Sequence, residues 1–106
     1  MDDAQFELGK KDGYSARALV SGLAMSEKPQ SYAVGYIAGY ASYVASMEHG
    51  IKKAAYESGK LAFRYRVPRD IIKAIVLDDI LKTTDNTTYE WFENGVEAEL
   101  EDFDKD

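Results

Sequence analysis

The chain has 106 residues, of which 45% are hydrophobic and 30% charged, a composition typical of one globular domain and not of a disordered segment. It contains no cysteine, which excludes a disulfide framework, a thiolate metal site and a cysteine nucleophile, and which fits a reducing cytoplasm. The formal net charge of −6 is unevenly distributed: residues 1–77 carry eleven Lys and Arg against eight Asp and Glu, whereas residues 78–106 carry two against eleven. We therefore expect a single domain, 1–106, with an acidic C-terminal segment, 83–106.

Capping residues and a proline predict two helices in the first half of the chain. Either of the aspartates at positions 2 and 3 is a good N-cap, and the helix that follows can run to about Ser26. Lys28-Pro29 then interrupts it, because the residue before a proline avoids the helical conformation. Ser31 is the expected cap of a second helix that continues to Glu48-His49.

The second half contains a glycine and a proline that separate further helices. Gly50 either ends the second helix or only kinks a longer rod into the next segment, 51–66. Pro68 is suited to the first turn of a helix over 69–82, RDIIKAIVLDDILK, before a polar loop at 83–86. Since this helix is apolar nearly all round, we expect it to be central in a small all-α bundle of four to five helices.

Glycines recur four residues apart in the first two predicted helices. Glycine costs a helix about 1 kcal/mol relative to alanine, so the repetition calls for a packing reason. The segments 6–20 and 32–46 share an aromatic residue, two glycines and a tyrosine in register, and weaker matches occur around Gly59 and Gly95. Glycines on one helical stripe allow two backbones to approach closely. We predict that the first two helices cross, within the chain or across a dimer, at Gly9, Gly13, Gly35 and Gly39.

A membrane span is the rival interpretation of these glycines. The stretch 29–47 has no charged residue, and GxxxG in an apolar segment is typical of membrane helix dimers. Only four of its residues are large aliphatics, however, and more than half are Tyr, Ser, Gly, Gln or Pro. A span needs a predominantly apolar run, so we expect no membrane association.

Tyrosines form a second notable surface on the helix predicted over 31–49. Three of them share one helical stripe with a methionine beside the glycines: Tyr36, Tyr40, Tyr43 and Met47. Tyrosine offers a large, stiff and amphipathic contact area. The stripe is interpreted first as core or homodimer contact and second as a surface for a partner or ligand.

The segment 52–73 contains a basic cluster with interleaved aromatic residues. Its clustered cations are Lys60, Arg64, Arg66 and Arg69. Alternating cations and rings can hold phosphates while bases stack, so direct binding of nucleic acid or a nucleotide is one hypothesis. The protein as a whole is acidic, so we favour instead a solvated face or a docking site for the chain's own acidic end.

Two structures compete for the acidic end. Asn94-Gly95 is a strong turn signal for a β-hairpin, whereas Thr87 and Glu90 form a capping box for a helix. The helix is favoured because it places the apolar residues of this segment on one stripe. A file of carboxylates would then form a partner-binding face that imitates nucleic acid. Its residues are Glu90, Glu93, Glu97, Glu99, Glu101, Asp102 and Asp104.

Catalysis has little support in the sequence. The only histidine, His49, lies at a predicted helix end, and no nucleophile–base pair or phosphate loop can be assembled. Asp78 and Asp79 point to different helical faces and with Asp85 make at most a weak Mg²⁺ site, so we expect no metal, no cofactor and no enzyme.

The hypothesis that accounts best for these surfaces is a small acidic cytoplasmic protein that binds and modulates or inhibits another protein. Size, charge and lack of cysteine are typical of phage or mobile-element inhibitors of nucleic-acid-processing enzymes such as CRISPR or restriction effectors, which act in the host cytoplasm. The alternatives are direct nucleic-acid binding by 52–73 and a structural homo-oligomer, for instance a homodimer.

Overall fold

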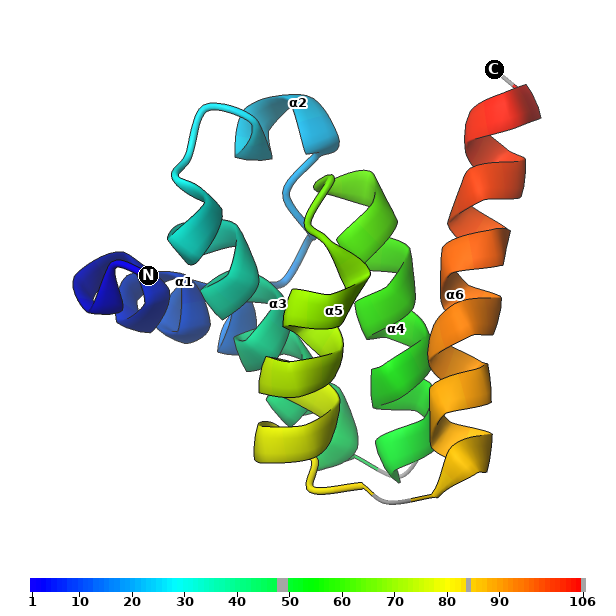
Figure 1. Ribbon diagram of the computed structural model, residues 1–106. Helices are drawn as coiled ribbons and strands as arrows, with labels where there is room; N and C mark the ends of the chain where they lie inside the picture. The colour runs from blue at the N-terminus through cyan, green and yellow to red at the C-terminus, as the bar shows by residue number, and fades with distance from the viewer. Residues whose placement is uncertain (48–49, 84, 106) are drawn as a thin grey trace.

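The computed structural model describes residues 1–47, 50–83 and 85–105, and within them every regular element is helical (Figure 1). In chain order these elements are α1 (Asp3–Tyr14), α2 (Gly22–Met25), α3 (Gln30–Ala45), α4 (Gly50–Arg64), α5 (Arg69–Ile72), the π-helical segment η1 (Lys73–Ile80) and α6 (Asn86–Lys105). The all-α prediction is confirmed. The alternative β-hairpin is wrong, because Asn94 and Gly95 both lie inside α6.

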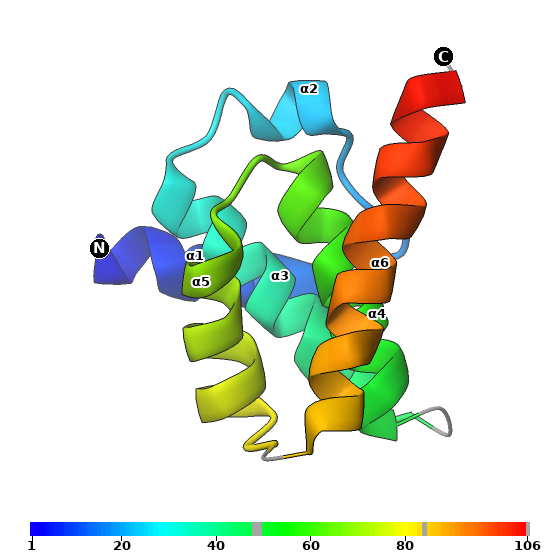
Figure 2. The ribbon, with the colours of Figure 1, turned by 45° about the vertical axis from the view of Figure 1, so that its right-hand side comes forward.

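The centre of the molecule is α3, and α1, α4 and the α5–η1 segment pack around it (Figures 1 and 2). Ten of its sixteen residues are buried, and these are small residues, tyrosines and a few aliphatics distributed around the whole helix. The prediction that the segment 69–82 is central is wrong. Ile71, Ile75 and Ile80 are only half-buried there, and Asp78 and Asp79 face solvent.

The predicted glycine crossing is confirmed as a contact between α1 and α3 within the chain. A methyl group on Gly9 would collide with the backbone carbonyl of Tyr32, and one on Gly35 would collide with that of Phe6. Gly13 and Gly39 repeat the arrangement one turn later, against the carbonyls of Tyr36 and Lys10. Such close approach is typical of helix interfaces stabilised by Cα–H···O=C contacts.

A second crossing of the same kind joins α4 to α6. Gly59 packs against the carbonyl of Phe92, and Gly95 packs against that of Tyr56. Figures 1 and 2 show the two helices side by side and running in the same direction. The weaker sequence matches around Gly59 and Gly95 therefore mark a crossing that the sequence did not assign.

The first helix is shorter than predicted. It begins as expected, with the Asp2 side chain accepting a hydrogen bond from the Gln5 backbone N–H, but it ends at Tyr14 instead of near Ser26. The chain then crosses as a loop to α2, because two tyrosine hydroxyl groups hold the backbone of Val20 in the non-helical conformation. Tyr36 accepts from the Val20 N–H at 3.1 Å, and Tyr65 donates to its carbonyl at 2.6 Å.

Two predicted helix caps are replaced by other residues. Pro29 is the N-cap of α3, and the Ser31 hydroxyl instead accepts from the backbone N–H of Asp2 at 2.9 Å. The N-terminus of α6 is capped by Asp85, whose carboxylate accepts from the Thr87 N–H at 2.9 Å, so the predicted capping box of Thr87 and Glu90 is not formed.

Gly50 separates α3 from α4. It has a φ of +71° at the first position of α4, and α3 already ends at Ala45, so the two helices do not form one rod. The predicted end of the second helix at Glu48 and His49 lies outside the described residues.

Among the helices in the described ranges, none combines the length and the apolar character needed to cross a bilayer.

Candidate functional site

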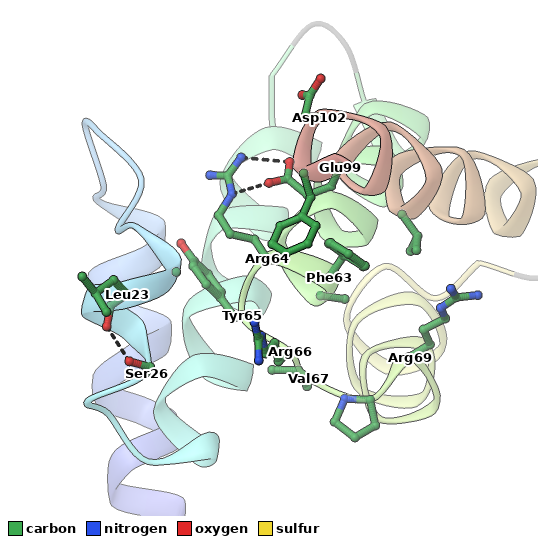
Figure 3. A pocket seen from close by; sticks show the side chains of 15 residues that line it. Leu23, Ser26, Phe63, Arg64, Tyr65, Arg66, Val67, Arg69, Glu99 and Asp102 are labelled. Atoms are coloured by element: carbon green, nitrogen blue, oxygen red, sulfur yellow. Dashed lines mark hydrogen bonds and ion pairs between the residues drawn. The ribbon is translucent and has the colours of Figure 1, made fainter. Parts of the chain in front are cut away.

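A hollow of about 1060 Å³ lies between α2, the C-terminal end of α4 with the connection to α5, and the C-terminal half of α6. We call it the groove. Figure 3 shows Leu23 of α2 and its C-cap Ser26 on one side, Glu99 and Asp102 of α6 on the other, and Phe63 with the residues that follow it between them. The volume is that of a binding site for a small molecule or for a short segment of chain.

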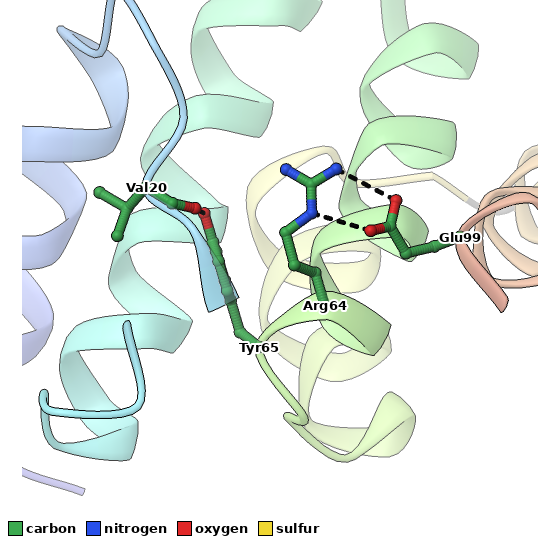
Figure 4. A network of polar contacts seen from close by, with 4 residues as sticks. All are labelled: Val20, Arg64, Tyr65 and Glu99. Carbon is green, nitrogen blue, oxygen red and sulfur yellow. Dashed lines mark hydrogen bonds and ion pairs between the residues drawn. The ribbon is translucent and has the colours of Figure 1, made fainter. Parts of the chain in front are cut away.

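Two consecutive residues at the end of α4 hold the two sides of the groove. The guanidinium of Arg64 donates to both carboxylate oxygens of Glu99 on α6, at 2.9 and 3.1 Å. The hydroxyl of Tyr65 reaches the opposite way, to the carbonyl of Val20 in the loop before α2 (Figure 4). Because a bidentate Arg–carboxylate pair fixes orientation as well as distance, the groove is formed before any ligand arrives.

These two contacts lie in partly buried surroundings that alter the titration of both side chains. The hydrogen bond that Arg64 donates to the Glu99 carboxylate is the main reason that the pKa of Arg64 is raised. Burial is the main reason that the pKa of Tyr65 lies well above its usual value of 10.0. Both groups therefore keep their donor protons throughout the neutral and mildly alkaline range.

The groove has an apolar floor and apolar rims. Ala62, Val67 and Val96 are buried at its base. At the rims the side chains of Leu23 and Phe103 are 82% and 60% exposed, and Phe103 meets the edge of Phe63 at a ring-centroid distance of 6.0 Å. Large apolar side chains exposed together around a hollow are characteristic of interaction sites.

The predicted basic patch contributes three arginines to the groove, and two of them are already paired. Arg64 holds Glu99, and Arg69 contacts Glu93 at 3.0 Å. Arg66 makes no ion pair with the described residues and is exposed. Lys60, the fourth predicted member, lies outside the groove, with its ammonium group 5.9 Å from the centre of the Tyr56 ring.

The predicted acidic face is divided by these ion pairs. Glu99 belongs to the groove, while Glu93 is held by Arg69 and by Lys73, the latter at 2.7 Å. For Glu93 and Glu99, the acidic end of the chain therefore docks on the chain's own basic segment, as one interpretation of the sequence predicts. Three predicted carboxylates remain exposed in one file along α6, namely Glu90, Glu97 and Glu101. Asp102 lines the groove, and the side chain of Asp104 lies outside what the structure describes.

The predicted tyrosine stripe is mostly interior. Tyr36 is buried in the core, Tyr40 and Tyr43 are half-buried, and Met47 is exposed. Tyr40 and Tyr43 border a smaller hollow of about 390 Å³ together with Tyr14, whose ring meets that of Tyr43 edge-on at 5.9 Å. Burial is the main cause of the raised pKa of Tyr40. Core packing therefore accounts for Tyr36, and only the outer part of the stripe is accessible.

The candidate metal and catalytic residues are not brought together. His49 lies outside the described residues, and the ranges that the structure does describe contain no group of three or more His, Cys, Asp or Glu side chains placed to hold a metal ion. Asp78 instead receives a hydrogen bond from the hydroxyl group of Tyr89.

Sequence reasoning missed the apolar rims of the groove. Neither Leu23 nor Phe103 is among the site residues that the sequence predicts, although both line the groove. A usable signal for Leu23 was its isolation in a run of small and polar residues, SGLAMSE, where no helical stripe could bury it.

Comparison with known proteins identifies a family without assigning an activity. No curated protein and no solved structure matches the chain. One family model does match, over residues 1–98, which include both glycine crossings. The chain belongs to the DUF2623 family, described as proteins of unknown function.

Proposed function

We propose that this protein is a non-enzymatic binding protein of the cytoplasm that recognises another protein through the groove and thereby modulates it. The observation that carries the proposal is the exposure of Leu23 and Phe103 around a groove whose sides are already held in place. A ligand that supplies apolar side chains can therefore bind with little rearrangement of this protein.

The expected affinity follows from the apolar area that is available. Full burial of a Leu or Phe side chain contributes about 1.5 to 3 kcal/mol, so the two rim residues together offer about 3 to 6 kcal/mol before the floor is counted. Association costs at least about 4 kcal/mol in lost freedom of motion. The two rim residues therefore roughly offset the cost of association, and the floor of the groove and polar contacts must supply the net affinity.

Capture of partners with matched variants tests this proposal. The wild-type protein and Leu23→Asp would be immobilised and exposed to cytosol, with Leu8→Asp as the control, because Leu8 is an exposed leucine of α1 outside the groove. A partner held by the groove is retained by the wild type and the control and lost by Leu23→Asp. Equal recovery by all three proteins, each checked for folding by circular dichroism, would contradict the proposal.

A second candidate function uses the file of Glu90, Glu97 and Glu101 on α6. These carboxylates are exposed and make no ion pair with the described residues, and their spacings of seven and four positions place them on one stripe of the helix. Such a file supports the inhibition of a nucleic-acid-processing enzyme, such as a CRISPR or restriction effector, by occupation of its phosphate-binding groove. The triple change to Gln should weaken that complex and reduce its dependence on salt; a complex indifferent to both would exclude this role.

The two remaining hypotheses have less support. The basic segment is a weaker candidate for direct nucleic-acid binding, because Arg64, Arg69 and Lys73 are engaged by carboxylates that phosphates would have to displace. A homodimer formed at the glycines has no basis, since both crossings join helices of the same chain.

A further inference from the structure

Arg66 occupies a backbone position that normally belongs to glycine. Its φ is +57°, in the left-handed region, and it lies two residues after Arg64, the last residue of α4. The backbone N–H of Arg66 donates to the carbonyl of Phe63 at 3.1 Å, and that of Val67 to the carbonyl of Ala62 at 2.9 Å. These two bonds are those of a helix end at which glycine is strongly preferred, because any other side chain crowds its own backbone there.

The side chain of Arg66 is also the cation of the groove that has no partner among the described residues. Arg64 is engaged by Glu99, and Arg69 by Glu93. The remaining charge of the groove lining is Asp102 on the α6 side, and it forms no ion pair with Arg66. Arg66 thus combines a strained backbone position with a cationic side chain that lines the groove and pairs with none of the described carboxylates, and this combination points to a role in recognition.

A helix-dipole role alone does not account for this residue. Basic side chains do suit the C-terminal end of a helix, and Lys82, which follows η1, has a φ of +52° as well. Lys82, however, does not line the groove. The two residues thus share the backbone strain and the sign of charge, and differ in their place relative to the site.

On the basis of the proposed function, we infer that the groove binds an acidic, apolar peptide segment of a partner protein, and that Arg66 receives a carboxylate of that segment. The guanidinium offers a planar fork that matches a carboxylate in two parallel hydrogen bonds. The apolar side chains of the segment then lie on Phe63 and Val67, against the rim residues Leu23 and Phe103.

Selection from a displayed library of random 12-residue peptides on the wild-type protein tests this inference directly. Enriched peptides should contain an Asp or Glu together with at least two large apolar residues. Synthetic copies, labelled for fluorescence polarisation, should bind Arg66→Gly at least 10-fold more weakly than the wild type. Glycine relieves the backbone strain at this position, so the variant should unfold thermally no earlier than the wild type and the loss cannot be ascribed to unfolding.

Lys82→Gly is the matched control. It should likewise melt no earlier than the wild type, but it should bind the peptides unchanged. Replacing the peptide Asp or Glu by its amide should weaken binding to the wild type about 10-fold, and should have little further effect on Arg66→Gly, because the two changes remove the same contact.

The possible results separate this inference from the proposed function. Peptides that lose binding to Leu23→Asp but not to Arg66→Gly, or that lack an acidic residue, would overturn the role of Arg66 and leave the groove as a binding site. Peptides indifferent to Leu23→Asp, or no enrichment at all, would overturn both. Self-association that Arg66→Gly abolishes, seen in light scattering, would show that a second copy occupies the groove and would also overturn the inference.

Discussion

Replacement of Gly95 by alanine is the sharpest test of how the second half of the molecule is held together. The ideal position of the new methyl group overlaps the carbonyl oxygen of Tyr56, and it lies 2.9 Å from the Tyr56 carbonyl carbon and 3.1 Å from the Lys60 nitrogen. All three are backbone atoms of α4, so no side-chain rotation relieves the collision. The two helices must separate by about 1 Å before the contacts become normal.

Two opposing terms give the expected magnitude. Alanine raises the intrinsic helix propensity of α6 by about 1 kcal/mol, and overpacking of a close contact costs about 1 to 3 kcal/mol. Separation of α4 from α6 also loosens the contacts of Phe92 and Val96, both buried, so we expect the upper part of that range. The net loss should be about 1 to 2 kcal/mol, which is a fall of about 5 to 15 °C in the midpoint of thermal unfolding.

The adjacent residue supplies the control. Asn94 is exposed on the same helix, and Asn94→Ala should stabilise the protein by up to about 0.7 kcal/mol through helix propensity alone. Urea unfolding followed by circular dichroism at 222 nm measures both variants. The reasoning fails if Gly95→Ala is as stable as the wild type, or if the two variants shift in the same direction.

Three further changes test other parts of the structure. Gly39→Val should lower the free energy of unfolding in urea by about 3 kcal/mol or more, because a branched side chain cannot enter the contact with the α1 backbone. A variant as stable as the wild type would contradict the first crossing. Arg64→Leu should lower the free energy of unfolding by about 1 to 2 kcal/mol, because the half-buried carboxylate of Glu99 is left unpaired. Changing Glu99 to Leu as well should restore part of this stability. If the losses of the two single variants simply add in the double variant, the pairing is contradicted. Burial, and then the hydrogen bond to Asp12, raises the pKa of Tyr32 from 10.0 to about 12. The neutral Tyr32 side chain therefore stabilises the fold fully below pH 10, and this contribution is lost as the pH rises from about 10 to 12. Tyr32→Phe should make that alkaline loss of stability shallower, and an unchanged slope would be evidence against it.

The first crossing could be predicted because its cause is local. Two glycines four residues apart on each of two segments mark matching small surfaces, and no other arrangement uses them as well. The second crossing carries one glycine per helix, so its spacing gave no repeat. An isolated glycine inside a helical pattern is tolerated, so by itself it does not predict a close contact between helices.

The end of the first helix could not be predicted because its cause is distant in sequence. Residues 15–21 are compatible with a helix by composition, but the backbone of Val20 is bound by Tyr36 and Tyr65, which lie 16 and 45 residues away. Two hydrogen bonds to a partly buried backbone group outweigh the small propensity gain of continuing the helix. The same loop places α2, and with it Leu23, beside the groove.

Of the candidate site, the sequence predicts the charged residues but not the groove that they line. The basic and acidic segments were each recognised, but their pairing joins residues as far apart as Arg64 and Glu99, and nothing in the local pattern shows which cation each carboxylate meets. The cation left over, Arg66, is identified by its φ and by the engagement of its neighbours, and both are tertiary facts.

The two crossings and most of the groove rims are formed by different parts of the chain. Each crossing joins two helices in which an aromatic residue precedes the first glycine by three positions, as in Phe6 to Gly9 and Phe92 to Gly95. The segments between the paired helices, 15–29 and 65–85, supply none of the backbone atoms that lie closest to the crossing glycines. The groove lies where the first of these segments, which contains α2, meets the C-terminal ends of α4 and α6. One side therefore belongs to a connecting segment and the other to the second pair of helices, and Tyr65 and Arg64 hold the two sides in place. The rim residues Leu23 and Phe103 are exposed and are not among the atoms nearest to the crossing glycines, so they can change without loss of the crossings, whereas Val96 of the floor also belongs to the second crossing.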